Sequence, residues 1–164
     1  GHCIPIDPFY LTWKAKQYDV DTRFIELAGE VNTKMPQWVI EKANIGLIEQ
    51  GKEISDSKVL LLGMAYKKNV DDLRESPSFE LIRILMEKGS KVDYHDFYIP
   101  QLNKTRKYNF EMQSVKLDTI NTYDLVILVT DHDKYDYDLL QDNAKLIVDT
   151  RGKLDHNLEN VISA

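Results

Sequence analysis

The chain has 164 residues, a length that suits one ordinary domain with an appendage, and its 43% apolar and 29% charged residues are typical of a soluble globular protein, not a disordered one. No apolar run is long enough to form a transmembrane segment. The net charge of −6 argues against a general binder of nucleic acid or anionic membranes, although a local cluster such as Lys67, Lys68 and Arg74 can still bind one anionic ligand.

The single cysteine, Cys3, cannot form an internal disulfide, and no secretory signal is in view, so we expect a reducing, cytoplasmic setting. The chain opens on Gly-His-Cys-Ile-Pro without an initiator methionine. We therefore expect it to be a fragment of a longer protein.

Two helices are predicted in the first third of the chain. Residues 8–17 suit a short helix with Asp7 at its N-cap and Pro8 at its first position. Apolar residues then recur at helical spacing over residues 21–50, where Pro36 should kink or split the helix and Gly51 should end it. We interpret this long helix as a connector and a dimer surface.

The composition changes after the connector. Residues 59–62 form a continuous apolar run ended by Gly63, which is typical of a strand buried on both faces of a parallel sheet. A helix of about three turns is predicted next, with Ser76 and Pro77 at its start and Gly89 at its C-cap.

Further strands are predicted at 91–95, more weakly at 113–117, and at 123–130 and 145–149. Strands and helices that alternate at this spacing predict an α/β fold, a Rossmann-like doubly wound parallel sheet preceded by the long helical connector. We expect the helical connector and dimer surface to lie within residues 1–52, and residues 53–164 to form the sheet domain.

The loop over residues 63–76 follows the first strand, where open α/β sheets bind ligands. Only Gly63 is present where a dinucleotide fingerprint needs three glycines, so a complete NAD site on this sheet alone is not expected. Lys67 and Arg74 suit a diphosphate, or else belong to a solvated loop that neutralises itself. Arg151 follows the last strong strand at the same sheet edge, as a ligand contact or an exposed loop arginine.

At the start of the chain, Cys3 and Asp7 lie four residues apart, just before a helix. A cysteine there can act as a nucleophile, and a nearby carboxylate can position or deprotonate a water. The alternative is a small buried cysteine and a simple helix cap. No metal-ligand spacing is present.

Two separated motifs resemble those of the UDP-glucose/GDP-mannose dehydrogenase family. They are Gly-His-Cys-Ile-Pro-Ile-Asp-Pro over residues 1–8, and Gly-Met-Ala-Tyr-Lys followed by Asp-Asp-Leu-Arg-Glu-Ser-Pro over residues 63–77. The resemblance covers nearly the whole chain as active-site loop, dimerisation helix and UDP-binding C-terminal domain. It implies that the N-terminal NAD-binding domain is missing, so the chain alone lacks a complete active site.

The family oxidises a sugar C6 alcohol twice with NAD⁺, through a cysteine thioester that water cleaves. The resemblance implies these roles: Cys3 as nucleophile, Asp7 as the carboxylate that assists hydrolysis, Tyr66, Lys67 and Arg151 in substrate binding, and Arg74 near the NAD. Ile6 and His2 replace a lysine and a serine that are usual in the UDP-glucose branch. The loop is similar to that of the branch that oxidises UDP-N-acetylhexosamines.

The resemblance therefore implies an NAD-dependent UDP-sugar 6-dehydrogenase of polysaccharide biosynthesis that forms a homodimer through the central helix. Two other classes are open from the residues. One is a stand-alone nucleotide-binding or regulatory module, and the other is a purely structural dimerisation module.

Overall fold

A computed structural model describes residues 6–105 and 107–164. Its described residues divide into two compact units, one that ends at Pro36 and one that spans Gln37–Ala164. The helix α2 (Arg23–Glu49) contributes to both units.

The first unit is a helical hairpin of α1 (Asp7–Lys16) and the first part of α2. The Phe9 ring packs directly onto Gly29, at the place where a larger residue would put its side chain. The Thr22 hydroxyl donates to the Thr12 hydroxyl across the hairpin at 3.0 Å. The N-cap is Ile6 and not Asp7 as expected: the Ile6 carbonyl accepts from the Phe9 amide, so the helix begins one residue earlier and Asp7 lies in its first turn.

Of the kink or split expected at Pro36, the split does not occur: α2 is continuous over 27 residues and has Pro36 inside it. A proline inside a helix costs about 3 kcal/mol through its missing amide hydrogen. The helix continues because Val39, Ile40 and Ala43, just beyond the proline, are buried in the core of the second unit. The helix ends at Glu49, and Gly51 closes it as predicted: this glycine has φ +72°, and the Gly51 and Lys52 amides donate to the Ile48 and Leu47 carbonyls.

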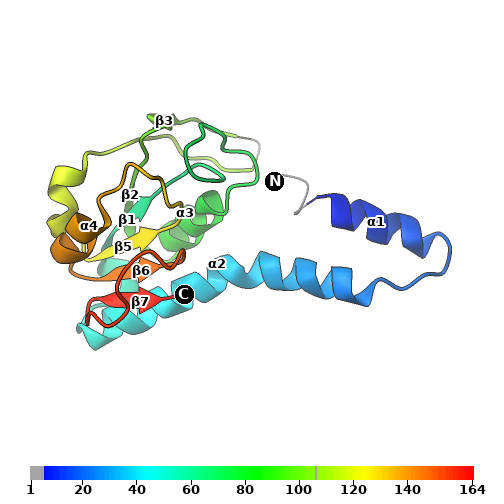
Figure 1. The fold of residues 1–164 in the computed structure, drawn as a ribbon, viewed down its shortest axis with the longest axis horizontal. Coiled ribbons are helices and arrows are strands. Elements are labelled where there is room, and N and C mark those ends of the chain that lie inside the picture. The colour runs from blue at the N-terminus through cyan, green and yellow to red at the C-terminus, as the bar shows by residue number, and fades with distance from the viewer. Residues whose placement is uncertain (1–5, 106) are drawn as a thin grey trace. The chain divides into compact units, whose positions relative to one another are not determined.

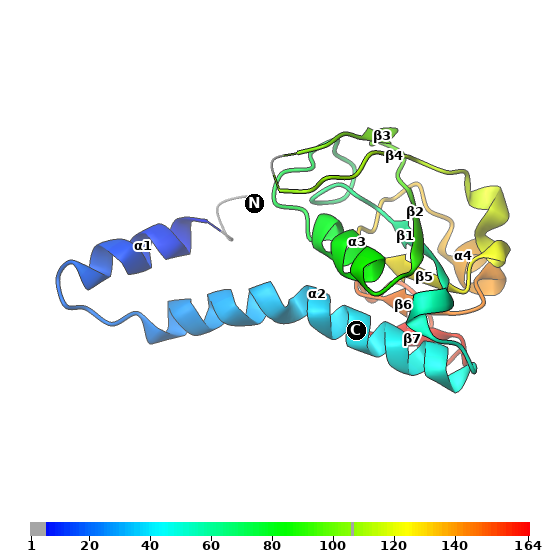
Figure 2. The same cartoon turned by 180° about the vertical axis from the view of Figure 1, so that it is seen from behind.

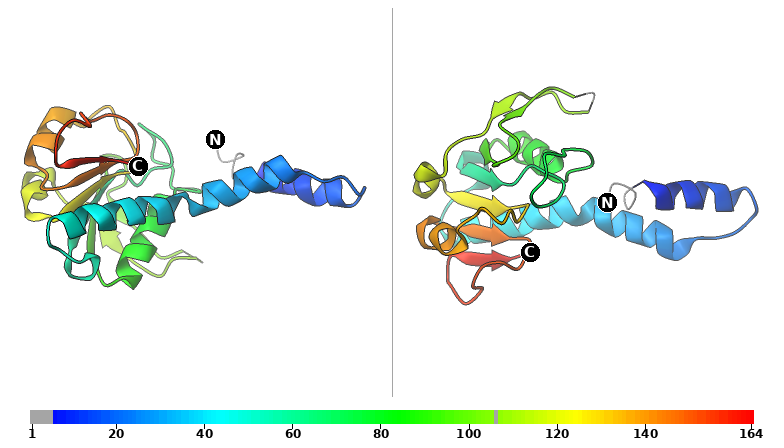
Figure 3. Two further views of the ribbon diagram at one scale, coloured as in Figure 1. Left: turned by 90° about the horizontal axis from the view of Figure 1, so that it is seen from below. Right: turned by 45° about the horizontal axis from the view of Figure 1, so that its top comes forward.

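The second unit is built on a five-stranded parallel sheet in the order β2-β1-β5-β6-β7 (Figure 1). The strands are β1 (Lys58–Leu62), β2 (Lys91–His95), β5 (Leu125–Leu128), β6 (Ile147–Asp149) and β7 (Val161–Ser163). The strands of the sheet point toward the same edge (Figure 3). Because β1 lies between β2 and β5, the strand order reverses beside β1, as the sequence predicts.

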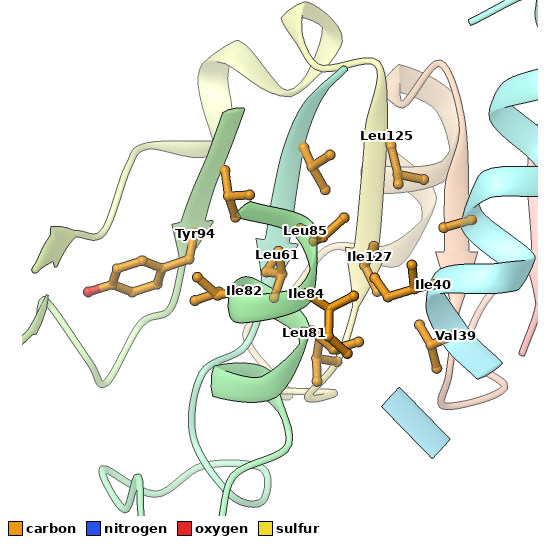
Figure 4. Close-up of a cluster of buried hydrophobic side chains, with 14 of the residues drawn as sticks. Val39, Ile40, Leu61, Leu81, Ile82, Ile84, Leu85, Tyr94, Leu125 and Ile127 are labelled. Carbon is orange, nitrogen blue, oxygen red and sulfur yellow. The ribbon is translucent and has the colours of Figure 1, made fainter. Parts of the chain in front are cut away.

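Helices cover both faces of this sheet. On one face, α3 (Ser78–Glu87) lies across the strands (Figure 2), and Figure 4 shows Leu61 and Ile127 of the sheet near Leu85 of α3 and Ile40 of α2. On the other face, Leu60 and Leu62 belong to a second buried cluster with α4 (Tyr137–Asn143). The Rossmann-like doubly wound fold is therefore confirmed.

Several boundaries differ from the sequence prediction. The helix expected from Ser76 begins at Ser78 with Pro77 as its N-cap, although the Ser76 hydroxyl still accepts from the Ser78 amide at 3.3 Å. The weak strand expected over 113–117 is reduced to β4 (Met112–Gln113), which pairs antiparallel with β3 (Gln101–Leu102). Among the described helices, even α2 is too polar to cross a bilayer.

Candidate functional site

The candidate site lies at the carboxyl ends of β1 and β5. Gly63 opens the loop after β1, and Val129 and Thr130 follow β5. The amides of Val129 and Thr130 both donate to the Leu62 carbonyl, at 2.9 and 3.1 Å. The Thr130 hydroxyl donates to the Ala65 carbonyl at 2.7 Å, so the two loops are joined where the strand order reverses.

Gly63 makes this close approach possible. Its φ is +87°, and a Cβ atom there would meet the Thr130 Cβ at 2.5 Å and the Thr130 carbonyl oxygen at 2.6 Å. The Gly63 carbonyl also accepts from the buried Ser78 hydroxyl at 2.9 Å, which fixes the start of α3 to the same loop. The space beside this glycine is therefore filled by protein and is not open to a phosphate.

Asp96, the residue after β2, is a buried hub of the site. Its Oδ2 accepts from the Met64 and Ala65 amides at 2.7 and 3.0 Å, and its Oδ1 accepts from the Tyr98 amide at 2.7 Å. Burial favours the neutral acid, but hydrogen bonds from the His132 side chain and the Tyr98 and Ala65 amides outweigh it and hold the pKa of Asp96 below its ordinary value. A buried carboxylate thus shapes the loop after β1.

His132 joins this hub from the loop after β5. Its side chain is fully buried, with Nε2 3.0 Å from the Asp96 Oδ2. Its Nδ1 accepts from the Asn69 amide at 2.9 Å, so Nε2 carries the proton and donates to Asp96. The ring therefore links three loops through a defined tautomer.

Asn69 is held in a left-handed conformation, with φ +63°. Its side-chain oxygen accepts from the Asp133 amide at 3.1 Å, and its Nδ2 donates to the Asp133 carboxylate. Lys68 is paired with the same carboxylate at 3.0 Å. The turn over residues 67–69 is thus fixed to the loop after β5.

The three cations of the loop after β1 differ in their partners. Lys68 pairs with Asp133, and the Arg74 guanidinium binds Asp72 through Nε at 3.1 Å and Nη2 at 2.8 Å. Lys67 is exposed, and no ion pair joins it to any described residue. Tyr66 is half-buried, and its amide donates to the Asp72 carbonyl at 2.7 Å. Lys67 is therefore the loop cation best placed to accept an anionic ligand.

Arg151 lies at the same edge of the sheet, after β6. Its Nε donates to the Val129 carbonyl at 2.6 Å, which places its guanidinium beside the end of β5. Asp149 fixes the loop below it, because its two carboxylate oxygens accept from the amides of Arg151, Gly152, Lys153 and Leu154. Burial opposes ionisation of Asp149, yet these amides and His156 hold its pKa below the ordinary value.

The remaining candidates are Cys3 and Asp7. Cys3 is outside the described residues. Asp7 is exposed in the first turn of α1. The structure brings Lys67 and Arg151 to one sheet edge and ties Arg74 to Asp72, and it does not relate Asp7 to them.

Sequence reasoning missed Asp96, His132, Asn69 and Asp149 as organising residues. The available signal was an aspartate at the carboxyl end of a strand: Asp96 directly follows β2, and Asp149 is the last residue of β6. No local pattern pairs Asp96 with His132, because 36 residues separate them.

Two models of one family match the chain in sequence order. Residues 1–34 match the central domain of the UDP-glucose/GDP-mannose dehydrogenase family, and residues 60–156 match its UDP-binding domain. The chain belongs to this family. The loops that carry Lys67 and Arg151 therefore lie within the segment that matches the UDP-binding domain of the UDP-glucose/GDP-mannose dehydrogenases.

Known family members include relatives similar over nearly all of this chain. The UDP-N-acetyl-D-mannosamine dehydrogenase of Methanococcus vannielii is 35% identical over 96% of the chain and 36% of the relative. The NDP-N-acetyl-D-galactosaminuronic acid dehydrogenase of Ralstonia solanacearum is 30% identical over 93% of the chain and 34% of the relative. The chain thus spans about a third of the length of these relatives.

The fold is also similar to that of a solved nucleotide-sugar dehydrogenase structure. The solved structure of the UDP-D-ManNAc dehydrogenase from Pyrococcus horikoshii superposes with a TM-score of 0.79 at 24% identity, over 99% of this chain and 37% of that one. At this identity the likeness shows the fold alone, and it agrees with the doubly wound sheet described above.

Proposed function

We propose that this chain is the C-terminal part of an NAD-dependent nucleotide-sugar 6-dehydrogenase that oxidises the C6 alcohol of a UDP-N-acetylhexosamine to the uronic acid. The observation that carries the proposal is the exposed Lys67, which is without an ion pair among the described residues and lies at the switch point of the sheet. The family membership and the names of the relatives support the reaction and the sugar class.

In this proposal Lys67 contributes a point charge to the diphosphate. Arg151, tethered to the Val129 carbonyl, has guanidinium nitrogens left for a second oxygen or the sugar. Tyr66 contacts the substrate from the same loop. Residues 53–164 act as the UDP-sugar-binding domain, and residues 1–52 carry the active-site loop and the dimerisation helices.

Cys3 and Asp7 carry the chemistry in this proposal. The Cys3 thiolate adds to the C6 aldehyde, the adduct is oxidised to a thioester, and water cleaves the acyl–sulfur bond to release the acid and the thiol. Asp7 positions that water or takes its proton. Each oxidation needs a hydride acceptor, which NAD⁺ supplies in the whole enzyme.

The described residues do not themselves fit an NAD site. The loop after β1 has one glycine, Gly63, and Thr130 occupies the space beside it, so the backbone offers no opening for a pyrophosphate. Arg74 is the one residue that the proposal directs toward NAD, and it would have to leave Asp72 or share it. We therefore propose that NAD binds to a domain upstream of this chain.

We also propose a cytoplasmic homodimer that forms through α2. The support is the set of large apolar side chains that α2 exposes in the first unit. A nucleotide-binding or dimerisation module without catalysis is the alternative function. It predicts nucleotide binding or dimers without turnover in any longer form of the protein.

Nucleotide binding tests the site directly. We expect Lys67→Ala to weaken UDP binding by about 1.5–3 kcal/mol, because a hydrogen bond to a charged group is lost. Lys68→Ala is the matched control: it removes the same charge from the neighbouring residue, whose ammonium is already paired with Asp133. Isothermal titration calorimetry at one fixed ionic strength should show a large loss for the first variant and a small one for the second.

Equal losses would make the effect one of net charge, and no loss for Lys67→Ala would return the loop to a solvated surface. The reaction itself is tested on the chain joined to its upstream coding sequence. NADH formation is followed by absorbance with UDP-glucose and with UDP-N-acetyl derivatives of glucosamine, mannosamine and galactosamine. Turnover with an N-acetylated sugar supports the proposal, whereas UDP binding without any NADH favours the non-catalytic module.

A further inference from the structure

Lys67 is flanked on both sides by backbone that one buried oxygen controls. The Asp96 Oδ2 accepts from the Met64 and Ala65 amides, which precede the lysine. The same oxygen accepts from His132, whose other ring nitrogen accepts from the Asn69 amide, two residues after the lysine. The backbone on each side of Lys67 is therefore bonded to the Asp96 carboxylate, directly before the lysine and through His132 after it.

The two side chains that do this cannot themselves contact a ligand in solvent. Asp96 and His132 have no exposed side-chain surface. Within the described part of the chain, every hydrogen bond of their side chains goes to the backbone of the surrounding loops or joins the two side chains to each other. Burying an aspartate and a histidine costs free energy unless both are hydrogen-bonded. Apolar residues would pack this part of the core without that cost, so the pair has a role beyond packing.

From this geometry we propose that Asp96 and His132 are positioning residues that hold Lys67 in place for the diphosphate of the substrate. The inference rests on the function proposed above and adds to it. Asn69 completes the device: its left-handed backbone is bonded to His132 and its side chain is clamped to Asp133, so the turn after Lys67 is ordered before any ligand arrives. A loop that is already ordered loses less conformational entropy on binding.

A pair of substitutions at His132 separates hydrogen bonding from shape. His132→Phe keeps a ring but loses both the donor to Asp96 and the acceptor for the Asn69 amide. His132→Gln offers an amide donor and a carbonyl acceptor about as far apart as the two ring nitrogens. We expect His132→Phe to weaken UDP binding on the order of tenfold, and His132→Gln to recover most of that loss.

A double-mutant cycle with Lys67→Ala shows whether the effect passes through Lys67. UDP affinity is measured by calorimetry on the full chain, with thermal unfolding of each variant to set the temperature at which all are folded. If His132 acts by placing Lys67, the loss caused by His132→Phe should largely disappear in the Lys67→Ala background. A role confined to stability would lower the melting temperature and leave the affinity changes additive.

If His132→Phe does not fold, Asn69→Gly serves in its place, because glycine accepts the left-handed backbone but removes the clamp to Asp133. It should also weaken UDP binding, and to a smaller extent once Lys67 is alanine. If the wild-type chain binds UDP but both the His132→Phe and the Asn69→Gly effects are additive with that of Lys67→Ala, the positioning role is overturned and the proposed function stands. A wild-type chain that does not bind UDP would overturn the proposed function, and the positioning role with it.

Discussion

Gly63 lies against Thr130 so closely that a Cβ atom at Gly63 would overlap Thr130. The glycine adopts φ +87°, where other residues are strained, and its missing Cβ is replaced by the Thr130 backbone and side chain. Because the Thr130 carbonyl oxygen is part of this contact, the neighbour cannot move aside as a flexible side chain could. The close approach of the two loops therefore depends on one absent methyl group.

We expect Gly63→Ala to lower the free energy of unfolding by about 3 kcal/mol, the sum of left-handed strain and overpacking. Gly152→Ala is the matched control, because Gly152 has φ +66° but no atom within 4 Å of an added Cβ. It should cost only the strain, about 1 kcal/mol. Urea denaturation of the three proteins gives the comparison, and equal costs would show that the contact with Thr130 is unimportant.

The residues of the site were predictable to different degrees. Lys67 and Arg151 could be placed at the sheet edge because each follows a strongly apolar strand, and the carboxyl ends of parallel strands meet. The pairing of Arg74 with Asp72 and the network of Asp96 and His132 could not, because they depend on side-chain directions and on contacts between distant loops.

Elements with a strong local pattern were predicted well. The strands β1 and β5 are buried on both faces, so they appear in the sequence as continuous apolar runs. By contrast, β7 has three residues and only its first is buried, so no periodicity marks it, and tertiary pairing with β6 alone makes it a strand. The hairpin of β3 and β4 is shorter still.

The C-terminal part of α2 acts as a layer of the sheet domain, and neighbouring residues test this. Leu47 is fully buried against the sheet, whereas Ile48 is 59% exposed on the same turn. We expect Leu47→Ala to lower the free energy of unfolding by about 2–5 kcal/mol, because it removes buried methyl groups and leaves a cavity. Ile48→Ala should change it by about 0.5 kcal/mol or less.

Chemical denaturation of both variants checks the assignment. Similar losses at Leu47 and Ile48 would mean that α2 does not cover the sheet through one face. If Leu47→Ala lowers the free energy of unfolding only slightly, Leu47 is not part of the core of the second unit.

The whole chain combines a sheet domain that buries its apolar residues with a helical unit that exposes them. In the first unit, α2 exposes Phe24 at 90%, Leu27 at 56%, Val31 at 52% and Met35 at 41%. These residues recur at spacings of three or four, so they form one stripe along the helix. An exposed apolar stripe of this kind marks an interaction surface.

If the partner is a second copy of the chain, one charge in this stripe should separate the copies. Phe24→Glu is expected to weaken dimerisation by tenfold or more, on the order of the cost of losing a buried aromatic anchor and burying a charge. Glu30→Gln changes a polar residue of the same helix and should leave dimerisation intact. Sedimentation equilibrium over a range of concentrations measures both, and circular dichroism confirms that the helix is retained. If the wild-type chain stays monomeric at every concentration, the stripe binds a different partner. If wild type and Phe24→Glu dimerise equally well, the dimer interface lies on a different surface.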